Sequence, residues 1–210
     1  LLPDNTDPLY KRWLGKWRVT STTSQVNEAP VTFEVIVKPG TVNSSYMIRG
    51  WGITIYGNRY DLRAYYQATY TGTSTPAIPI PKSTGILYTK TDNAIYGYDG
   101  VYPIRTRYSR ITHSTGAYSS FTTTQTSPKL VGIYDEAQAG QATMYGSGYN
   151  TGTDYVGIEF FRWTENQASY YTSPAVRPGY TAKDFPVGPF TWVQLIDADG
   201  NDLTTGTPAE

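Results

Sequence analysis

The side chains that could carry covalent catalysis are few, because the chain has one histidine and no cysteine. A nucleophilic site needs a base beside an activated nucleophile and a third group that orients the base. His113 lies in the segment Thr-His-Ser-Thr-Gly, and the sequence contains no Gly-x-Ser-x-Gly turn that would present a serine nucleophile. We therefore expect His113 to be a solvated loop residue, and we expect the protein not to be an enzyme.

Paired carboxylates are the other simple route to hydrolysis, and a glycosidase needs two of them about 5–10 Å apart. Glu159 is the acid of interest, because alternation in the strand expected at 155–163 puts it on the same face as Phe161 and Trp163. It could act as an acid there, or it could be a structural residue bonded to a tyrosine hydroxyl or to a neighbour of Arg162. We favour the structural role, because ion-pair networks without a catalytic function also contain such acids.

Two charged clusters raise the question of an ion site. The acidic run 197–202 has its glycine, Gly200, at the fourth position, whereas a helix-loop-helix calcium site needs glycine at the sixth, so we expect a turn and neither metal nor cofactor. Arg105, Arg107 and Arg110 could suggest an anion site. Alternation puts Arg105 and Arg107 on the solvent face of a strand, so we expect no anion to bind there.

Aromatic residues are the most informative feature of the composition, with 20 tyrosines and 5 tryptophans among 210 residues. Their rings combine an apolar body with a polar edge, which suits amphipathic ligands and sugars. Tyrosine is also simply a good strand former, so some inward-pointing tyrosines (Tyr66, Tyr88 and Tyr108) could line a cavity while others fill it. The residues that we predict to contact a ligand are Trp51, Tyr66, Tyr88, Tyr108 and Glu159.

The charge and hydropathy of the chain exclude several partners. Seventeen basic and 17 acidic residues give a formal net charge of zero, which lacks the basic footprint of a nucleic-acid-binding protein. No apolar run approaches the roughly 18 residues of a transmembrane helix. A length of 210 residues is compatible with one β-barrel or β-sandwich domain.

Short runs with a period of two, separated by turn residues, predict an all-β fold with ten to twelve antiparallel strands in a meander. The run 60–70 is the clearest, with one face formed by its even-numbered residues. Residues 86–90 and 94–98 flank a turn and suggest a hairpin. The run 155–163 is apolar on both faces, so we expect the proline-containing segment 164–189 to cover it.

The residues around Trp17 mark the start of the β-domain. Asp7 and Pro8 are suitable as the cap and first residue of a short helical turn. Gly15 can end this turn in a left-handed conformation, after which Trp17 and Val19 share one face of a strand. We expect Trp17 to be deeply buried and Trp192, in the last strand, to be more peripheral.

This arrangement resembles the lipocalin, or calycin, family, in which Gly-x-Trp follows a short helical turn and the tryptophan lies across the closed end of an up-and-down barrel. Gly15 and Trp17 match that motif, and Thr153-Asp154-Tyr155 matches a second one. The resemblance implies a lipocalin-like barrel, with Arg162 as the arginine that packs on Trp17. It implies one domain over 1–210, with a lead-in at 1–14, the barrel at 15–163, and a wrapping segment with a last strand at 164–203.

The chain looks most similar to lipocalin-like domains of exported Bacteroidetes lipoproteins. That similarity implies non-catalytic binding of a small amphipathic ligand or glycan in an extracellular or periplasmic location, by an outer-membrane-anchored surface protein whose lipid anchor could lie upstream of the sequence. The alternative is a structural or protein-interaction domain of a larger surface lipoprotein, with a filled barrel. The barrel interior distinguishes the two: an interior cavity of about 300 Å³ or more with convergent polar groups favours binding, and a packed interior favours the structural role. The sequence predicts no oligomeric state.

Overall fold

The computed structural model describes residues 1–22, 30–57, 60–73, 79–92, 94–112, 117–121, 125–146, 154–163, 171–180 and 184–205. His113 and Thr153, which the sequence analysis singled out, lie outside these ranges. No helix in the described ranges has the length and apolar character needed to cross a membrane.

The described residues are almost entirely β-structure, which confirms the predicted fold class. The two helices are single turns, α1 (Pro8–Lys11) and α2 (Ile53–Tyr56). The strands are β1 (Gly15–Thr22), β2 (Thr32–Pro39), β3 (Ser45–Arg49), β4 (Asp61–Tyr70), β5 (Ser83–Thr91), β6 (Gly97–Asp99), β7 (Tyr102–Thr112), β8 (Ala117–Phe121), β9 (Gln125–Tyr134), β10 (Gln141–Gly146), β11 (Asp154–Trp163), β12 (Tyr171–Pro174) and β13 (Val187–Ile196).

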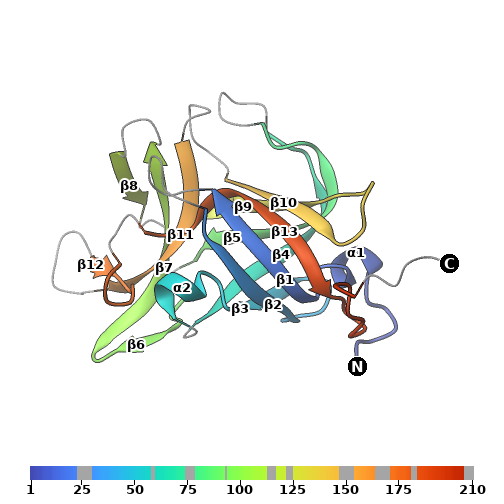
Figure 1. The fold of residues 1–210 in the computed structure, drawn as a ribbon, viewed down its shortest axis with the longest axis horizontal. Coiled ribbons are helices and arrows are strands. Elements are labelled where there is room, and N and C mark those ends of the chain that lie inside the picture. Colours follow the sequence, from blue (N-terminus) through green and yellow to red (C-terminus); the bar gives the residue numbers. More distant parts are fainter. Residues whose placement is uncertain are drawn as a thin grey trace.

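Eight antiparallel strands close into a lipocalin-like barrel in the order β1-β2-β3-β4-β5-β9-β10-β13 (Figure 1). The closing contact is between β13 and β1, where Trp17 lies opposite Gln194 and Val19 opposite Trp192. Closure removes the unpaired strand edges that an open sheet would expose.

Two insertions into the barrel meander form a second sheet. Strands β6–β8 come between β5 and β9, and β11 and β12 come between β10 and β13. The insertions pair through β7 and β11, from Asp154 opposite Thr112 to Arg162 opposite Ile104. The barrel therefore does not coincide with residues 15–163, because β11 belongs to the second sheet and β13 closes the barrel. The expected hairpin of 86–90 with 94–98 is also wrong, since β5 pairs with β4 and β9 while β6 pairs with β7.

Strand β11 is buried on both faces, as its apolar pattern predicted. Ile158 and Phe160 on one face are 0% and 1% exposed, and Glu159 and Phe161 on the other are also 0% and 1% exposed. In the segment expected to cover it, β12 pairs with the end of β11, while residues 164–170 and 181–183 lie outside the described ranges.

Four of the five tryptophans fill the core. Trp13, Trp17, Trp51 and Trp192 are each no more than 1% exposed, so the expected burial of Trp17 is confirmed. Trp192 is not peripheral, because its ring lies 5.6 Å from that of Trp17 and 6.1 Å from that of Trp13. The reason is topological: β13 is a wall of the barrel and directs Trp192 inward.

The short helix α1 covers one end of the barrel, where its predicted cap is present. The carboxylate of Asp7 accepts a hydrogen bond from the Leu9 amide, and Pro8 occupies the first turn. Helix α1 leads into Trp13, whose indole N–H donates to the carbonyl of Gly85 at 2.8 Å. The Trp17 indole then donates to the Trp13 carbonyl, also at 2.8 Å. We refer to this end as the closed end.

Tyrosines buried beside α1 make stability sensitive to alkaline pH. Burial raises the pKa of Tyr10 to about 12 and raises the pKa of Tyr46 still further. Above about pH 10 the unfolded chain loses these protons while the folded chain keeps them, so the free energy of unfolding falls as pH rises. We expect urea midpoints to decrease from pH 9 to pH 11.5. The decrease should be shallower in Tyr10→Phe and Tyr46→Phe than in the exposed-site control Tyr98→Phe, and equal slopes in all three would contradict this account.

Candidate functional site

The fold does not bring the five predicted ligand-binding residues together. Trp51 and Tyr108 are 1% exposed and belong to the main core. The Trp51 ring packs edge-on against Phe33 and Phe190, at 5.4 and 5.1 Å between ring centroids. The side chains of Trp51 and Tyr108 are therefore part of the packed hydrophobic core.

Tyr66 lies at the closed end, half-buried beside α1. Its hydroxyl donates to the Asp7 carboxylate at 2.6 Å, and its ring meets Tyr10 edge-on at 5.5 Å. Burial, together with the hydrogen bond to Asp7, raises its pKa. The polar edge of Tyr66 is thus engaged in anchoring the lead-in segment to β4.

Tyr88 does not point inward, contrary to the expectation. It lies opposite Tyr65, with the two rings stacked at 5.5 Å, and it packs against the smaller cluster that contains Ile86 and Val131. Leu87 and Thr89 take the inward positions on β5 and are fully buried in the barrel. Both faces of β5 are apolar here, so alternation alone could not distinguish inside from outside.

Glu159 is buried in an ion pair, and its partners differ from the tyrosine hydroxyl and the neighbour of Arg162 that the sequence suggested. Arg107 donates from Nε to a Glu159 carboxylate oxygen at 2.8 Å, and Ser109 donates to the same oxygen. Arg107 is only 2% exposed, so the prediction that it lies on a solvated face is wrong. The error arises because Arg107 on β7 lies directly opposite Glu159 on β11, and this face of the second sheet is buried instead of facing solvent.

Arg162 does not pack on Trp17. Its guanidinium forms an ion pair with Asp99 at 3.2 Å, in the second sheet. The rings that contact Trp17 are those of Trp13, Tyr134 and Trp192. An arginine is nevertheless present at the closed end, directly after α1.

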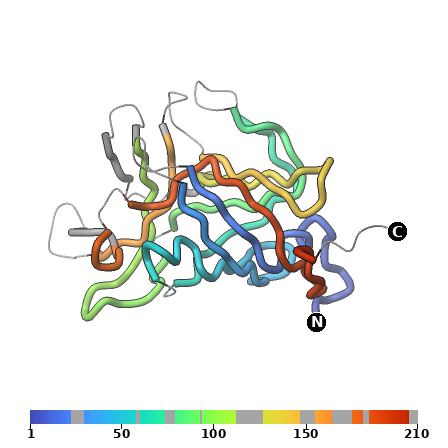
Figure 2. Tube along the Cα trace, in the orientation of Figure 1, coloured from blue at the N-terminus to red at the C-terminus, as the bar shows by residue number. Residues whose placement is uncertain are grey.

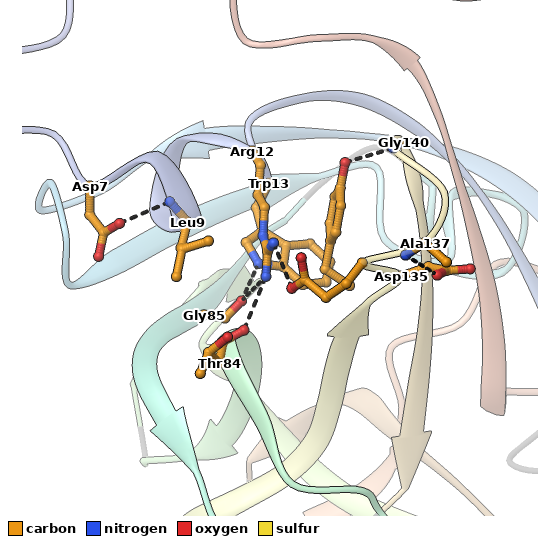
Figure 3. A network of polar contacts seen from close by, with 11 residues as sticks. Asp7, Leu9, Arg12, Trp13, Thr84, Gly85, Asp135, Ala137 and Gly140 are labelled. Atoms are coloured by element: carbon orange, nitrogen blue, oxygen red, sulfur yellow. Dashed lines mark hydrogen bonds and ion pairs between the residues drawn. The ribbon is translucent and has the colours of Figure 1, made fainter.

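That residue, Arg12, is at the centre of a polar network (Figure 3). Its guanidinium carbon lies 4.2 Å above the Tyr134 ring, and its Nη2 donates to the Thr84 carbonyl at 3.0 Å. The other terminal nitrogen pairs with Glu136 at 2.8 Å. The Tyr134 hydroxyl in turn accepts a hydrogen bond from the Gly140 amide. Arg12 thereby ties α1 to β5 and to the β9–β10 turn.

Removing the Arg12 side chain should be destabilising for this reason. Arg12→Leu deletes hydrogen bonds from a charged donor, each worth about 1.5–3 kcal/mol, and leaves the Tyr134 ring without its cation. We expect a loss of about 2 kcal/mol in the free energy of unfolding, measured by urea titration. Arg18→Leu, at an exposed position on β1, is the matched control and should change stability by less than about 0.5 kcal/mol. A similar loss in the two variants would contradict the assigned role of Arg12.

A groove opens beside this network, on the outside of the closed end. Its volume is about 570 Å³, and α1, the β9–β10 turn, β13 and the turn after β13 contribute to its lining. The apolar lining residues are Pro8, Tyr134, Ala139, Val193, Ala198 and Leu203, and the polar ones are Lys11, Arg12, Gln141, Gln194, Asp197 and Asp199. These residues come from three stretches of the chain that are far apart in sequence, so no local pattern could indicate the groove.

Both cations at the groove have an ion-pair partner. Lys11 forms an ion pair with Asp199 at 2.9 Å, as Arg12 does with Glu136. Asp197 accepts hydrogen bonds from the amides of Asp199 and Asn201, so the run 197–202 is the predicted turn. Among the described residues no group of three His, Asp or Glu side chains could hold a metal ion. Each cation at the groove is therefore paired with an acid, and Asp197 adds a further carboxylate that is held by turn hydrogen bonds.

Comparison with protein-family models, with curated proteins and with solved structures finds no match for this chain.

Proposed function

We propose that this protein is a non-catalytic binding domain for a small amphipathic ligand or glycan, and that the ligand binds in the closed-end groove. The observation that carries the proposal is the groove itself, whose volume of about 570 Å³ lies within the range of about 300–1,000 Å³ of ligand pockets. In this proposal the domain acts outside the cell, as the resemblance to exported lipoprotein domains implies.

The lining of the groove favours an uncharged ligand. Because Lys11 is paired with Asp199 and Arg12 with Glu136, an anionic ligand would have to displace an existing ion pair, while a cationic ligand would meet Asp197, whose carboxylate already accepts turn hydrogen bonds. The exposed side chain of Leu203 and the neighbouring Val193 offer an apolar contact, while Gln141 offers an amide. Such a mixture suits a molecule with an apolar face and hydroxyl groups, such as a sugar or an alkyl glycoside.

Two features of the described residues support a non-catalytic role. The carboxylate of Glu159 is fully buried and paired with Arg107, away from the groove. The acids at the groove, Asp197 and Asp199, are occupied by turn hydrogen bonds and by Lys11.

A structural or protein-interaction role is the second candidate, and the packing of the barrel favours it. Trp17, Trp51 and Trp192 belong to the main core, where the Trp192 ring lies 5.6 Å from that of Trp17 and 6.4 Å from that of Trp51. The interior near these rings is therefore filled by the chain's own side chains. If no small molecule binds in the groove, this role explains the fold better.

A neutral amphiphile can test the proposal directly. We expect n-octyl-β-D-glucoside, added below its critical micelle concentration, to shift backbone amide resonances of residues 139–141 and 193–203 in ¹H–¹⁵N spectra. Shifts confined to amides of the barrel interior, such as Thr89 and Leu130, would place the ligand in the barrel and contradict the proposal. The absence of shifts at saturating concentration would favour the structural role.

A further inference from the structure

Gln194, in β13, is a largely buried residue in the lining of the closed-end groove, and its side-chain amide is held in one orientation. Figure 2 shows the end of β13 beside the blue α1 and the yellow β9–β10 turn, which also line the groove. Gln194 is 7% exposed, and its Nε2 donates to the backbone carbonyls of Arg12 at 3.2 Å and of Leu14 at 2.9 Å. Because both partners are acceptors, the amide nitrogen must face them, and the amide oxygen Oε1 points elsewhere.

The oxygen of this amide is left available. Gln194 Oε1 accepts no hydrogen bond from any residue that the structure describes. It is also not one of the described polar atoms that are sealed from solvent without a partner, so it keeps access to the groove that Gln194 lines. Polar groups at largely buried positions are normally paired, and an amide oxygen has two lone pairs. Oε1 is therefore a hydrogen-bond acceptor fixed in place at the groove.

Gly140 keeps the space beside this acceptor open. A Cβ at Gly140 would lie 3.7 Å from Gln194 Oε1 and 3.7 Å from Leu203 Cδ1, which are ordinary contact distances. A ligand carbon at that point would therefore touch the acceptor and an apolar side chain together. The backbone of Gly140 is itself fixed, because its amide donates to the Tyr134 hydroxyl and its carbonyl accepts from the Gln194 amide.

The other hydrogen-bonding groups at the groove differ from Gln194 in being engaged or in being donors. Lys11 and Arg12 are each paired with an acid. The Tyr134 hydroxyl accepts from the Gly140 amide at 2.6 Å, and its own proton has no acceptor among the described residues. An uncharged acceptor and an uncharged donor thus lie beside Gly140. This pair is complementary to hydroxyl groups, which both donate and accept.

We propose that Gln194 determines the ligand specificity of the closed-end groove, by accepting at Oε1 a hydrogen bond from a saccharide hydroxyl while a C–H face of the sugar contacts Leu203. The inference rests on the proposed function and narrows its ligand to one with a hydroxyl donor. A ligand that only accepts hydrogen bonds, such as an ether or an ester, would cover Oε1 without supplying a donor, and an acceptor left unpaired in this way weakens binding.

Octyl glucosides in which a sugar hydroxyl is replaced by fluorine test the inference on the unmodified protein. Fluorine is close in size to a hydroxyl group but cannot donate a hydrogen bond. With each free hydroxyl replaced in turn, we expect at least one analogue to bind the wild type about fivefold or more weakly than octyl glucoside, by isothermal titration calorimetry. Equal affinities for octyl glucoside and all its analogues would overturn the inference, while the proposed function would stand.

Two substitutions of Gln194 separate the acceptor from the structural role of the amide. Gln194→Met and Gln194→Glu both remove the N–H donors to the Arg12 and Leu14 carbonyls, but only glutamate keeps an acceptor oxygen. We expect Gln194→Met to bind octyl glucoside about fivefold or more weakly than the wild type and no longer to distinguish it from the sensitive analogue. Gln194→Glu should retain both binding and discrimination. Equal losses in the two variants would overturn the inference, and the wild-type titrations decide it if either variant does not fold.

The side-chain amide signals of Gln194 in ¹H–¹⁵N spectra give a direct readout. A hydrogen bond accepted at Oε1 polarises the amide, so these signals should shift when octyl glucoside binds and shift less with the sensitive analogue at saturation. If octyl glucoside shifts the backbone amides of the groove but leaves these signals in place, the inference fails alone. If octyl glucoside does not bind in the groove, the inference and the proposed function fail together.

Discussion

Replacing Gly15 by alanine is expected to unfold most of the protein. Gly15 has φ +117°, a conformation that residues with a side chain rarely adopt, and an added Cβ would lie 2.1 Å from the Ile196 carbonyl oxygen. That carbonyl belongs to β13, so relieving the clash would separate the two strands that close the barrel. We expect a loss of more than about 4 kcal/mol, which is exceptional for a single substitution and a large share of the roughly 5–15 kcal/mol of a folded domain.

Gly100 provides the matched control for this prediction. It also has a positive φ, +61°, but an added Cβ at this position would meet no atom within 4 Å. Gly100→Ala should therefore show only the backbone strain of a left-handed residue, about 1–2 kcal/mol. Urea titrations followed by tryptophan fluorescence compare the two. Equal losses in the free energy of unfolding would mean that the close approach of β13 to Gly15 does not add to the cost of the substitution.

Truncation of either central tryptophan should be nearly as damaging. Trp17→Ala and Trp192→Ala each remove a fully buried ring from the cluster that also contains Trp13 and Trp51, and such truncations cost about 3–5 kcal/mol. Because the two rings touch, their effects should not add in the double variant. Calorimetry of the single and double variants measures this, with the exposed Tyr98→Ala as control. A loss below about 1 kcal/mol for Trp17→Ala would show that this residue does not hold the closed end together.

Local signals in the sequence are sufficient to predict the fold class and the position at which the barrel begins. Period-two alternation predicts strands wherever one face is buried, and the cap at Asp7 that begins the helical turn depends only on neighbouring residues. Gly15 was expected to end that turn, but helix α1 ends at Lys11 with Arg12 as its C-cap, and Gly15 is the first residue of β1. The burial of Trp17 followed from its place after that turn.

Pairing between distant strands could not be predicted in this way. Alternation separates the two faces of a strand but does not say which one points inward, so it placed Tyr88 on the wrong side and Arg107 in solvent. Nothing local indicates that the two insertions pair with each other, or that β13 closes the barrel beside β1. The groove depends on the second of these long-range contacts, since α1, β13 and the β9–β10 turn meet only after closure.

The affinity of octyl glucoside for two matched variants tests the central claim, that this protein binds ligands in the closed-end groove. Ala139 lines the groove, whereas Ala137 lies two residues away in the same exposed turn and is not part of the lining. By isothermal titration calorimetry, we expect Ala139→Trp to weaken binding at least about tenfold, equivalent to about 1.4 kcal/mol, and Ala137→Trp to leave it unchanged. Equal affinities in the two variants would contradict the claim.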